Sequence, residues 1–415
     1  MPHNAMPKPL SNIRILDMSR ILAAPWAAQM LGDLGAEVIK VERPKTGDDS
    51  RFFGPSAMKD SEGRSTRQTS FFISANRNKK SITIDLSKPE GQDLVRQLAA
   101  KCDVLIENYK VGDLKRYGLD YESLKAINPK LVYCSVTGFG QTGPYAARPG
   151  YDTLFQAMGG LMSTTGLPDD VPGGGPMKTG PSLADVLAGQ FAMSAILAAL
   201  YHRDQHSGVG QCIDVSLLDS VIASMTHTVT DYLVSGDVPK RRGTEGNGGM
   251  PSRMYRCADQ DIVVVAGNQE QFRSLCAVLG CPEAVDTPGF ETPMSRGVNR
   301  KHLAEVMEPL FAKRQAAELL AALAQGNVPA GPINDLAQVF ADPQVKVRDM
   351  AVEVAHPEAL GGVLRMVGNP VKYSATPVEA YLAPPTLGQH THQVLGEVLG
   401  LDAAAIDALG SKGVI

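Results

Sequence analysis

The chain has 415 residues, which exceeds the length at which a single hydrophobic core stops growing, so we expect two domains. Its composition, with 43% hydrophobic and 20% charged residues, is that of an ordinary globular enzyme. The net charge of −4 comes without any block of like charges, which argues against nucleic acid and against an anionic membrane surface as partners.

The N-terminal third alternates between strand and helix patterns. Ile13–Met18 is predicted as a buried strand, Ala23–Leu34 as a helix closed by Gly35, and Glu37–Val41 as a second strand. Further strands are predicted at 81–85, 104–107 and 131–136, with helices at 91–101 and 121–127 between them. This order predicts a parallel, doubly wound sheet with right-handed crossovers up to about residue 140.

In the middle of the chain the alternation of strands and helices gives way to long helices and to loops rich in proline and glycine. A loop rich in proline and glycine is predicted at 167–176, followed by helices at 184–202 and 214–234. The Gly-rich stretch Ser235–Pro251 predicts a domain boundary. A strand at 261–266 and a helix at 269–279 then indicate a smaller α/β unit, which is expected to end at the elbow Val328–Ile333. A last helix is predicted at 389–399.

Several common kinds of site lack their sequence signatures. The turn Ser19–Pro25 after the first predicted strand has no glycine, so nicotinamide binding is not expected. A structural crossover and a site for a different nucleotide-like ligand both stay open there. His390 and His392 have no third ligand cluster near them in sequence, so no metal site is expected. The chain also lacks the Gly-x-Ser-x-Gly elbow of hydrolases.

The cysteines and the hydropathy pattern bear on the cellular setting. Six cysteines are scattered without a C-x-x-C pair, which argues against disulfides and for a reducing compartment. The N-terminus shows neither an apolar signal core nor an Arg-rich presequence. The most apolar helix, Val186–Tyr201, is too short and too rich in alanine to predict a membrane span. We therefore expect a cytoplasmic protein without a membrane partner.

Asp185 stands at the start of the alanine-rich helix predicted at 184–202. The free N–H groups and the dipole at a helix N-terminus favour negative charge, so we expect this carboxylate to stay ionised, with a low pKa. An ionised, positioned carboxylate can attack an acyl group and hold it covalently. The alternative is that Asp185 only caps its helix.

A second feature is the run Gly243–Gly249, which can place several backbone N–H groups close together. Such a loop could stabilise a developing oxyanion or close over a reactive intermediate. A flexible linker between domains explains the same run equally well.

A series of short motifs runs along the chain. In order, they are Ile15-Leu-Asp17, Leu31-Gly-Asp-Leu-Gly-Ala-Glu-Val-Ile-Lys-Val-Glu42, Asn76-Arg-Asn-Lys-Lys-Ser81, Glu107-Asn-Tyr109, Ser135-Val-Thr-Gly-Phe-Gly-Gln-Thr-Gly-Pro144 and Gly388-Gln-His-Thr391. Taken together, these motifs resemble those of the class III CoA-transferases, which include formyl-CoA transferase, carnitine CoA-transferase and α-methylacyl-CoA racemase. The resemblance covers nearly the whole chain.

The resemblance implies an α/β fold with a Rossmann-like large domain built from both chain ends and a smaller α/β domain between them. It also implies an interlocked, ring-shaped homodimer. We accordingly expect residues 1–235 and 336–415 to form the large, CoA-binding domain, 255–335 the small domain, and 236–254 a Gly-rich loop or linker.

The resemblance also implies the chemistry. Asp185 matches the family's nucleophile, which attacks a donor thioester to form a mixed anhydride, then takes CoA as an enzyme thioester and passes it to an acceptor carboxylate. CoA is thus a carrier substrate, and no permanently bound cofactor is expected. Gly248, Gly249 and Met250 match the glycine loop that covers the site in formyl-CoA transferase, which has a glutamine at the position of Met250.

The resemblance also implies which residues of this chain contact CoA. They are Leu22, Ala23, Arg43, Leu86, Asn108, Tyr109, Arg116, Tyr151 and Asp152. Arg43 and Arg116 suit phosphate oxygens, because guanidinium groups bind them in a fork geometry. Leu22 replaces a glutamine of formyl-CoA transferase, so specificity for formate and oxalate is not expected.

Two alternatives to transfer stay open. The racemase branch uses a histidine in a Gly-His-Asp triplet, and this chain has Gly150-Tyr151-Asp152 instead. A phenol with a pKa near 10 is a poor base at neutral pH, which favours transfer over racemisation. The other alternative is a non-catalytic CoA-binding paralogue.

Within the transferases, four segments resemble succinate–hydroxymethylglutarate CoA-transferase and its bacterial dicarboxylate relatives. They are Gly166-Leu-Pro168, Tyr232-Leu233, Val263-Val-Val-Ala-Gly-Asn-Gln-Glu-Gln-Phe272 and Gly331-Pro-Ile-Asn334. A dicarboxylate such as succinate would leave a free carboxylate in the site, which requires a cation. Arg51, Lys178 and Arg253 are the candidates, and solvated surface residues are the alternative reading of all three.

Overall fold

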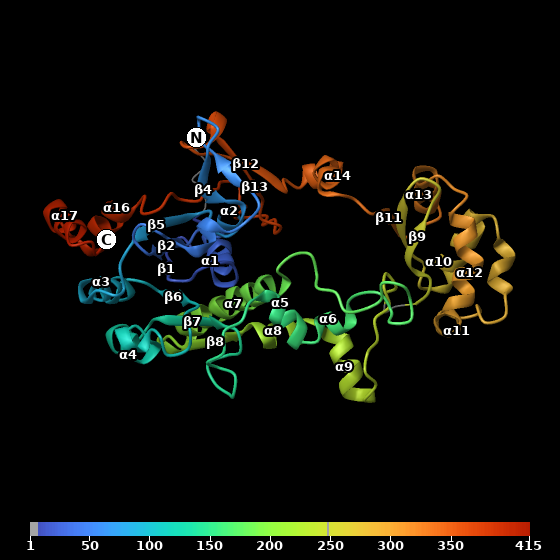
Figure 1. The fold of residues 1–415 in the computed structure, drawn as a ribbon, viewed down its shortest axis with the longest axis horizontal. Helices are drawn as coiled ribbons and strands as arrows, with labels where there is room; N and C mark the ends of the chain where they lie inside the picture. Colours follow the sequence, from blue (N-terminus) through green and yellow to red (C-terminus); the bar gives the residue numbers. More distant parts are fainter. Residues whose placement is uncertain (1–6, 247–248) are drawn as a thin grey trace. The chain divides into compact units, whose positions relative to one another are not determined.

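The computed structural model of the chain describes residues 7–246 and 249–415, which fall into two compact units (Figure 1). Unit 1 contains the chain up to Met162, together with Lys178–Val238 and Lys346–Ile415. Unit 2 contains Ser163–Met177 and Pro239–Val345. The segment Ser163–Met177 is expected from the sequence in the large domain, but it pairs with the start of the second stretch of unit 2. The N–H of Gly243 donates to the carbonyl of Gly166 at 3.0 Å.

Unit 1 is built on a six-stranded sheet in which all strands run parallel. The strands, in spatial order, are β5 (Lys79–Thr83), β2 (Glu37–Glu42), β1 (Arg14–Asp17), β6 (Val104–Glu107), β7 (Val132–Thr137) and β8 (Cys212–Ser216). Numbered along the chain, this is the order 3-2-1-4-5-6 of doubly wound nucleotide-binding folds, and it confirms the α/β prediction. The strand order reverses between β1 and β6, where such folds bind ligands.

Neighbouring residues of the central strands pack into two separate hydrophobic cores, one on each face of the sheet, because side chains alternate across a sheet. Ile15 packs with one core and Leu16 with the other, and both are fully buried. The first face is covered by α1 (Ala23–Asp33), α5 (Asp152–Met158), α7 (Leu183–His202) and α8 (Leu217–Ser224). The second is covered by α3 (Pro89–Ala99), α4 (Tyr121–Ile127), α16 (Thr391–Leu399) and α17 (Ala403–Ser411). The C-terminal helices thus complete the second face.

The β8 segment corrects one prediction. A single helix is expected over 214–234, but Cys212–Ser216 forms the edge strand and two helices follow, α8 and α9 (Thr226–Ser235). Ile213 and Val215 alternate as β-branched residues of a strand, and Gly210 allows the chain to approach β7 closely. A methyl group on Gly210 would lie 2.1 Å from the carbonyl oxygen of Leu131. The Ser216 side chain caps α8 by accepting the Asp219 N–H.

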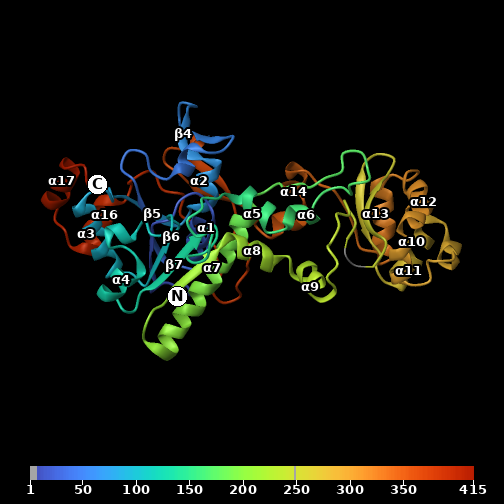
Figure 2. The same ribbon diagram turned by 60° about the horizontal axis from the view of Figure 1, so that its bottom comes forward.

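Helix α7 lies side by side with α1 on the first face (Figure 2). Its buried stripe is made of small and aliphatic residues, among them Ala188, Ala192 and Ile196, and this allows close packing. Among the described residues, one helix, Leu183–Ser207, is long and apolar enough to cross a membrane by length and composition. A core helix of a globular protein meets the same criteria, and α7 contributes to the core of unit 1.

Smaller elements surround the sheet of unit 1. They are η1 (Asp49–Phe52), β3 (Ala57–Lys59), β4 (Ser65–Thr69), α2 (Ser70–Ala75), η2 (Lys115–Tyr117), η3 (Arg203–Ser207), β12 (Ala351–Ala355), η5 (Leu360–Gly362) and β13 (Val363–Val367). Of the other short helices, α6 (Leu161–Thr164) and α15 (Pro343–Val347) lie where the chain passes from one unit to the other. The helix α14 (Leu336–Ala341) belongs to unit 2, although residues 336–415 are expected from the sequence in the large domain. β3 pairs with β4 and β12 with β13, both antiparallel.

Unit 2 has a core of its own on a three-stranded antiparallel sheet in the order β11-β10-β9. The strands are β9 (Ser252–Arg256), β10 (Asp261–Val265) and β11 (Ala330–Pro332). The helices are α10 (Gln269–Leu279), η4 (Pro282–Asp286), α11 (Pro293–Val298), α12 (Arg300–Phe311) and α13 (Ala316–Gln325). The rings of Tyr255 and Phe311 stack at 4.0 Å between centroids, which joins β9 to α12.

Candidate functional site

Two adjoining cavities open at the carboxyl ends of β1 and β6 in unit 1. The first, of about 430 Å³, is lined by Asp185 and is called the Asp185 cavity here. The second, of about 330 Å³, is lined by Arg43 and is called the Arg43 cavity. Both are lined by Arg20 and Tyr109, so one ligand can extend through the two. This is the switch point at which doubly wound sheets bind their ligands.

The positions carried over from the family divide between these cavities. Leu22, Ala23, Asn108, Tyr109, Tyr151, Asp152 and Asp185 line the Asp185 cavity. Arg43, Leu86, Tyr109 and Arg116 line the Arg43 cavity. Residues as far apart in the chain as Leu22 and Asp185 are therefore brought together, because the carboxyl ends of parallel strands meet at one edge of the sheet.

The turns after β1 and β6 are joined by the side chain of Asn108. Its Oδ1 accepts the backbone N–H of Arg20 at 2.8 Å, and its Nδ2 donates to the carbonyl of Arg20 at 2.7 Å. The Glu107 carboxylate accepts the N–H of Tyr109 at 2.7 Å, and burial raises the pKa of Glu107 to about 7. The two hydrogen bonds of the Asn108 side chain thus fix the turn after β1 against the turn after β6.

Asp185 is the third residue of α7 and lies partly buried at the wall of its cavity. Its pKa is raised to about 7, because burial and, second, the nearby charge of Asp152 outweigh the lowering effect of the backbone N–H of Ala23. The expectation of a low pKa is therefore wrong. The reason is that removal of the carboxylate from water outweighs the favourable field of the helix N-terminus.

The helix cap is supplied by Asp152 and not by Asp185. Asp152 Oδ1 accepts the N–H of Ala184 at 2.8 Å, while the residue at the N-cap position, Ser182, makes no side-chain cap. Asp152 Oδ2 accepts from Gln156 Nε2 at 2.6 Å, and Gln156 Oε1 in turn accepts the N–H of Thr179 at 2.9 Å. These contacts fix the segment before α7. They leave the Asp185 carboxylate facing the cavity and the Ala23 N–H, which argues against a capping role alone.

Helix α7 can reach the turn after β1 because Gly189 lies one turn beyond Asp185. A methyl group at Gly189 would stand 2.6 Å from the carbonyl oxygen of Ala23 and 3.1 Å from the Trp26 ring. Contacts this short require the absence of a side chain. The glycine therefore sets the distance between Asp185 and the backbone of Ala23.

The three candidate cations for a substrate carboxylate have different surroundings. Arg51 is wrong as a candidate, because it is buried, binds the Glu42 carboxylate through two nitrogens at 2.8 and 2.7 Å, and lies 3.7 Å from the Phe72 ring centroid. Arg253 belongs to unit 2 and pairs with Glu308 at 3.0 Å.

Lys178 is the candidate that lines the Asp185 cavity. It is exposed, and its Nζ donates only to backbone carbonyls, of Thr179 at 3.0 Å and Gly180 at 3.2 Å, in the contacts found among the described residues. Arg148 and Arg20 also line this cavity and are not predicted from the sequence. Their positions could have indicated them, since Arg20 lies in the turn after the first strand and Arg148 directly precedes the Pro149–Asp152 segment.

Three arginines, Arg20, Arg43 and Arg116, line the Arg43 cavity. Arg20 and Arg43 both pair with the Asp49 carboxylate, Arg20 at 2.9 Å. Arg116 is 62% exposed, with its guanidinium 4.6 Å from the Tyr117 ring centroid. Three cations around one cavity can bind the phosphates of a nucleotide-like ligand.

The Gly-rich loop lies in unit 2, and Gly248 falls outside the described residues. Gly249 passes close to Gly267, whose carbonyl oxygen would lie 2.1 Å from a methyl group on Gly249. The Met250 side chain is 3% exposed and packs in the core of unit 2, and its carbonyl accepts from Arg296 Nε at 2.6 Å. A substrate contact from the Met250 side chain is therefore excluded in this conformation. Among residues 7–246 and 249–415, no group of three or more His, Cys, Asp or Glu residues is arranged to hold a metal ion.

Comparisons with known proteins show the family of the chain. The family model described as CoA-transferase family III matches residues 10–391. Over 408 residues the chain is 42% identical to the succinyl-CoA:glutarate CoA-transferase of Mus musculus, covering 98% of this chain and 90% of that protein. Over 397 residues it is 43% identical to the succinate–glutarate CoA-transferase of Agrobacterium fabrum, covering 96% and 97%.

A solved structure is similar over the whole fold. The crystal structure of a CAIB/BAIF family protein from Brucella suis superposes with a TM-score of 0.83 at 41% identity, covering 95% of this chain and 100% of that one. With its doubly wound sheet, its paired cavities and these relatives, the chain belongs to CoA-transferase family III and is an acyl-CoA:carboxylate CoA-transferase.

Proposed function

We propose that this enzyme moves CoA from succinyl-CoA to a dicarboxylate through covalent intermediates on Asp185. The observation that carries the proposal is the position of the Asp185 carboxylate. It lies partly buried in one cavity, next to a second cavity ringed by arginines, at the carboxyl ends of the sheet. The relatives named above act, by their names, on succinyl-CoA and glutarate.

The first half of the reaction transfers the acyl group. An Asp185 oxygen attacks the thioester carbonyl carbon, the C–S bond breaks, and CoA leaves as a thiolate while a mixed anhydride forms. The thiolate then attacks the Asp185 carbonyl carbon. The anhydride C–O bond breaks, succinate leaves, and Asp185 carries CoA as a thioester.

The second half repeats these steps with the acceptor. A carboxylate of the acceptor attacks the Asp185 carbonyl carbon and expels the CoA thiolate, which gives a second anhydride. The thiolate attacks the acceptor carbonyl carbon and releases Asp185 as a free carboxylate. No proton is consumed over the cycle, so the site needs a nucleophile, oxyanion stabilisation and protection from water.

Residues of this chain provide charge stabilisation and substrate binding around the Asp185 nucleophile. The N–H of Ala23 and the N-terminus of α7 face developing negative charge near Asp185. Arg20, Arg43 and Arg116 suit the phosphates of CoA, and Tyr109 lies between the two cavities. Lys178 and Arg148 are placed to meet the free carboxylate of a dicarboxylate in the Asp185 cavity.

The experiment that tests the proposal is trapping of the intermediate. The enzyme is incubated with succinyl-CoA, treated with hydroxylamine or borohydride, and digested for peptide mass mapping. Modification of the peptide that holds Asp185 is expected, and modification only elsewhere would overturn the assignment. A non-catalytic paralogue would bind CoA without any label. A racemase would exchange an α-proton of its acyl-CoA with deuterated water in the absence of an acceptor acid.

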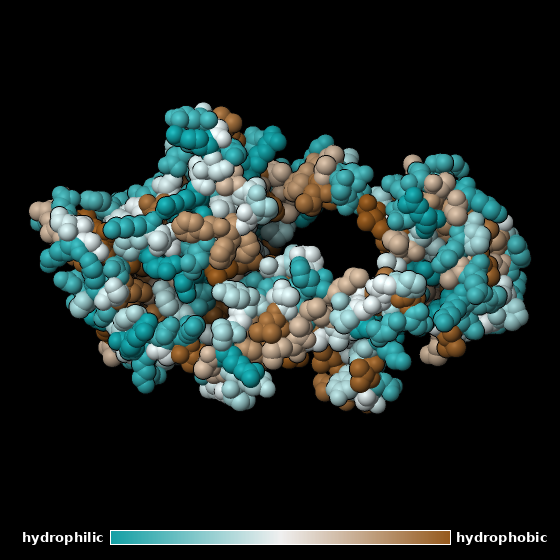
Figure 3. Space-filling view, in the orientation of Figure 1, coloured by the Kyte–Doolittle hydropathy of each residue, from teal (hydrophilic) through white to brown (hydrophobic). Residues whose placement is uncertain are grey.

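We also propose that the enzyme works as an interlocked homodimer. Large apolar side chains stand exposed on α7, α8 and α9, and Figure 3 shows apolar surface gathered over α9. Leu233 and Val234 are 73% and 83% exposed, and such patches on soluble proteins mark interaction sites. Light scattering on a size-exclusion column should give twice the chain mass. A Leu233→Glu/Val234→Glu variant should shift that mass towards the monomer.

We further propose a cytoplasmic location, which the six free cysteine thiols support. Fractionation of the native host, with the protein followed by immunoblot, tests this. Recovery in a membrane or secreted fraction would contradict it.

A further inference from the structure

The turn that carries Leu22 and Ala23 into the Asp185 cavity begins at a disfavoured backbone conformation. Ile21 has φ of 72°, in the left-handed region. That region is uncommon for any residue with a Cβ and is a genuine outlier for a β-branched one. Such conformations persist only where surrounding contacts impose them, and they cluster at functional sites.

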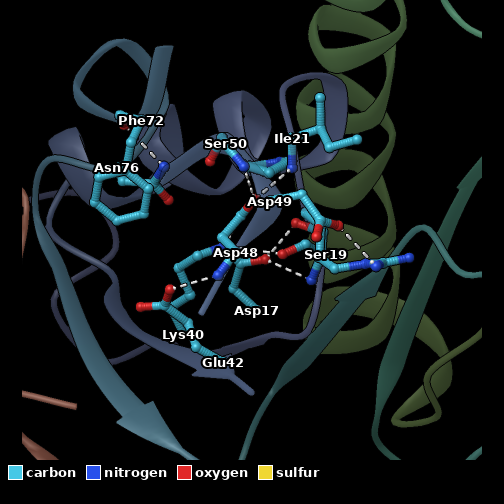
Figure 4. A network of polar contacts seen from close by, with 12 residues as sticks. Asp17, Ser19, Ile21, Lys40, Glu42, Asp48, Asp49, Ser50, Phe72 and Asn76 are labelled. Carbon is cyan, nitrogen blue, oxygen red and sulfur yellow. Dashed lines mark hydrogen bonds and ion pairs between the residues drawn. The ribbon is translucent and has the colours of Figure 1, made fainter. Parts of the chain in front are cut away.

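The contacts that impose it come from a buried ion pair (Figure 4). Asp48 Oδ1 accepts the N–H of Ile21 at 3.1 Å and that of Ser50 at 2.9 Å. Asp48 Oδ2 lies 2.8 Å from Lys40 Nζ, and both side chains are fully buried. Lys40 Nζ also donates to the carbonyl of Ser19 at 2.8 Å. The Lys40–Asp48 pair therefore binds the backbone of the turn on both sides of Arg20, at Ser19 and at Ile21.

A second buried pair holds the flanks of the same turn. Asp17 Oδ1 accepts the N–H of Ser19 at 3.0 Å, just before the turn. Lys79 Nζ binds Asp17 Oδ2 at 2.8 Å and donates to the carbonyl of Pro25, in the first turn of α1, also at 2.8 Å. With its entry and exit fixed in this way, the turn keeps the conformation that Asp48 selects.

Buried ion pairs contribute little net stability, because desolvation offsets most of their attraction. Stability alone therefore does not explain why two buried ion pairs lie at the edge of a substrate cavity. Ala23 follows Ile21 by two residues and lines the same cavity as Asp185, and its backbone N–H lowers the pKa of the Asp185 carboxylate. The φ angle of Ile21 decides where that N–H points.

We propose that Asp48 and Lys40 are positioning residues, whose ion pair holds Ile21 in the left-handed conformation and thereby aims the Ala23 N–H at the Asp185 carboxylate. The inference rests on the proposed role of Asp185 as nucleophile. Neither residue lines the Asp185 cavity, so we expect their effect on acylation to be exerted through the backbone of the turn. Asp48 does line the Arg43 cavity, and substitutions at Ile21, which does not line it, separate an effect on the turn from an effect on CoA binding.

The test uses rescue by glycine, which adopts a left-handed φ without strain. Single-turnover acylation by succinyl-CoA is followed by rapid quench, and trapped Asp185 adduct is quantified in the wild type and in Asp48→Ala. We expect Asp48→Ala to slow acylation by about 10- to 100-fold, below the loss seen when an oxyanion donor is removed outright. Ile21→Gly in the Asp48→Ala background should recover at least about five-fold.

Two matched variants separate the backbone effect from other losses. Ile21→Ala removes the same side chain but keeps the Cβ, so in the Asp48→Ala background it should give no recovery. Asp33→Ala breaks another buried pair of unit 1, that with Arg77 at 2.6 Å, away from both cavities. It should lower the melting temperature without slowing acylation of the folded fraction. If Asp48→Ala does not fold, Lys40→Met/Asp48→Ala removes both charges and is tested with the same Ile21 substitutions.

The outcomes distinguish this inference from the proposed function. A wild-type enzyme that forms no Asp185 adduct overturns the proposed function. A wild type that forms the adduct while Asp48→Ala acylates at the same rate overturns the positioning role alone. Equal recovery by glycine and alanine at position 21, or recovery by neither, also overturns the positioning role.

Discussion

Asp152 holds the start of the helix that carries Asp185, and its negative charge opposes the ionisation of that same residue. Asp152 accepts the N–H of Ala184 at 2.8 Å, and its charge is the second cause, after burial, of the raised pKa of Asp185. The carboxylate that orders the nucleophile thus also makes it more basic. A carboxylate with a raised pKa is a better nucleophile once it is ionised.

The first prediction concerns the pH dependence of acylation. Asp185 attacks only as the carboxylate, so the single-turnover rate should rise with pH through a midpoint near its pKa of about 7. In Asp152→Asn the neighbouring charge is removed, while the amide oxygen of the new side chain can still accept the Ala184 N–H. The midpoint should therefore move to lower pH. Stopped-flow or quench measurements from pH 5 to about 9 check this.

Glu107 provides the control for that profile, because burial also raises its pKa to about 7. Glu107→Gln should leave the midpoint in place. A profile that is flat across this range, or one that follows Glu107 and not Asp152, would show that Asp185 does not control the rate.

The second prediction is the effect of Asp185→Asn on activity and stability. Turnover should fall by at least about 10³-fold, because an amide cannot form the anhydride. In the unfolded chain Asp185 ionises near its ordinary pKa of about 3.9, while in the folded protein it does so only near 7. The folded state therefore holds more protons between these values, and wild-type stability falls as pH rises through that window.

The amide removes this loss. Asp185→Asn should melt at a higher temperature than the wild type at pH 8 and at nearly the same temperature at pH 4. Differential scanning fluorimetry at the two values measures the difference. Equal melting temperatures at pH 8 would mean that the carboxylate is not desolvated, and unchanged turnover would remove Asp185 from the mechanism.

The third prediction concerns Gly189 and the approach of α7 to the turn after β1. In Gly189→Ala the new methyl group would lie 2.6 Å from the Ala23 carbonyl oxygen, which belongs to the backbone and cannot easily yield. Helix and turn must separate, so we expect about 10²-fold slower acylation together with a stability loss of about 1–3 kcal/mol. Rapid-quench kinetics and chemical denaturation measure these effects.

Gly297 in α11 is the matched control, because a methyl group there would meet no atom within 4 Å. Gly297→Ala should be neutral or stabilise by up to about 1 kcal/mol through helix propensity. Wild-type acylation in Gly189→Ala would show that the close approach does not position Asp185.

The fourth prediction addresses recognition of the dicarboxylate. Lys178→Met and Arg148→Met each remove a cation from the Asp185 cavity. KM for glutarate or succinate as acceptor should rise about 10-fold or more, with a much smaller change for a monocarboxylate such as acetate. Lys125→Met, on α4 with its Nζ 5.4 Å from the Tyr121 ring centroid, is the matched control outside both cavities. Equal effects on mono- and dicarboxylates would assign these cations another role.

Much of unit 1 follows from local patterns. Short apolar runs such as Val104–Glu107, separated by helices of regular period, predict a parallel sheet because only crossovers can join such strands. The edge strand β8 could not be predicted in this way. Its residues Cys212–Ser216 directly precede a helix, and only pairing with β7 shows that they form a strand.

The amino-acid sequence by itself determined the fold class, the family and several of the residues that line the two cavities, because periodicity and motifs are properties of neighbouring residues. It did not indicate Arg20 or Arg148. Tertiary structure alone decided the pKa values, the ion pairs and the burial of those residues. The pKa of Asp185 depends on Asp152 and on burial, the pairing of Arg51 depends on Glu42, and the burial of Met250 depends on the core of unit 2. Solvation and charge pairing depend on distances between segments far apart in the chain, and no local pattern encodes those distances.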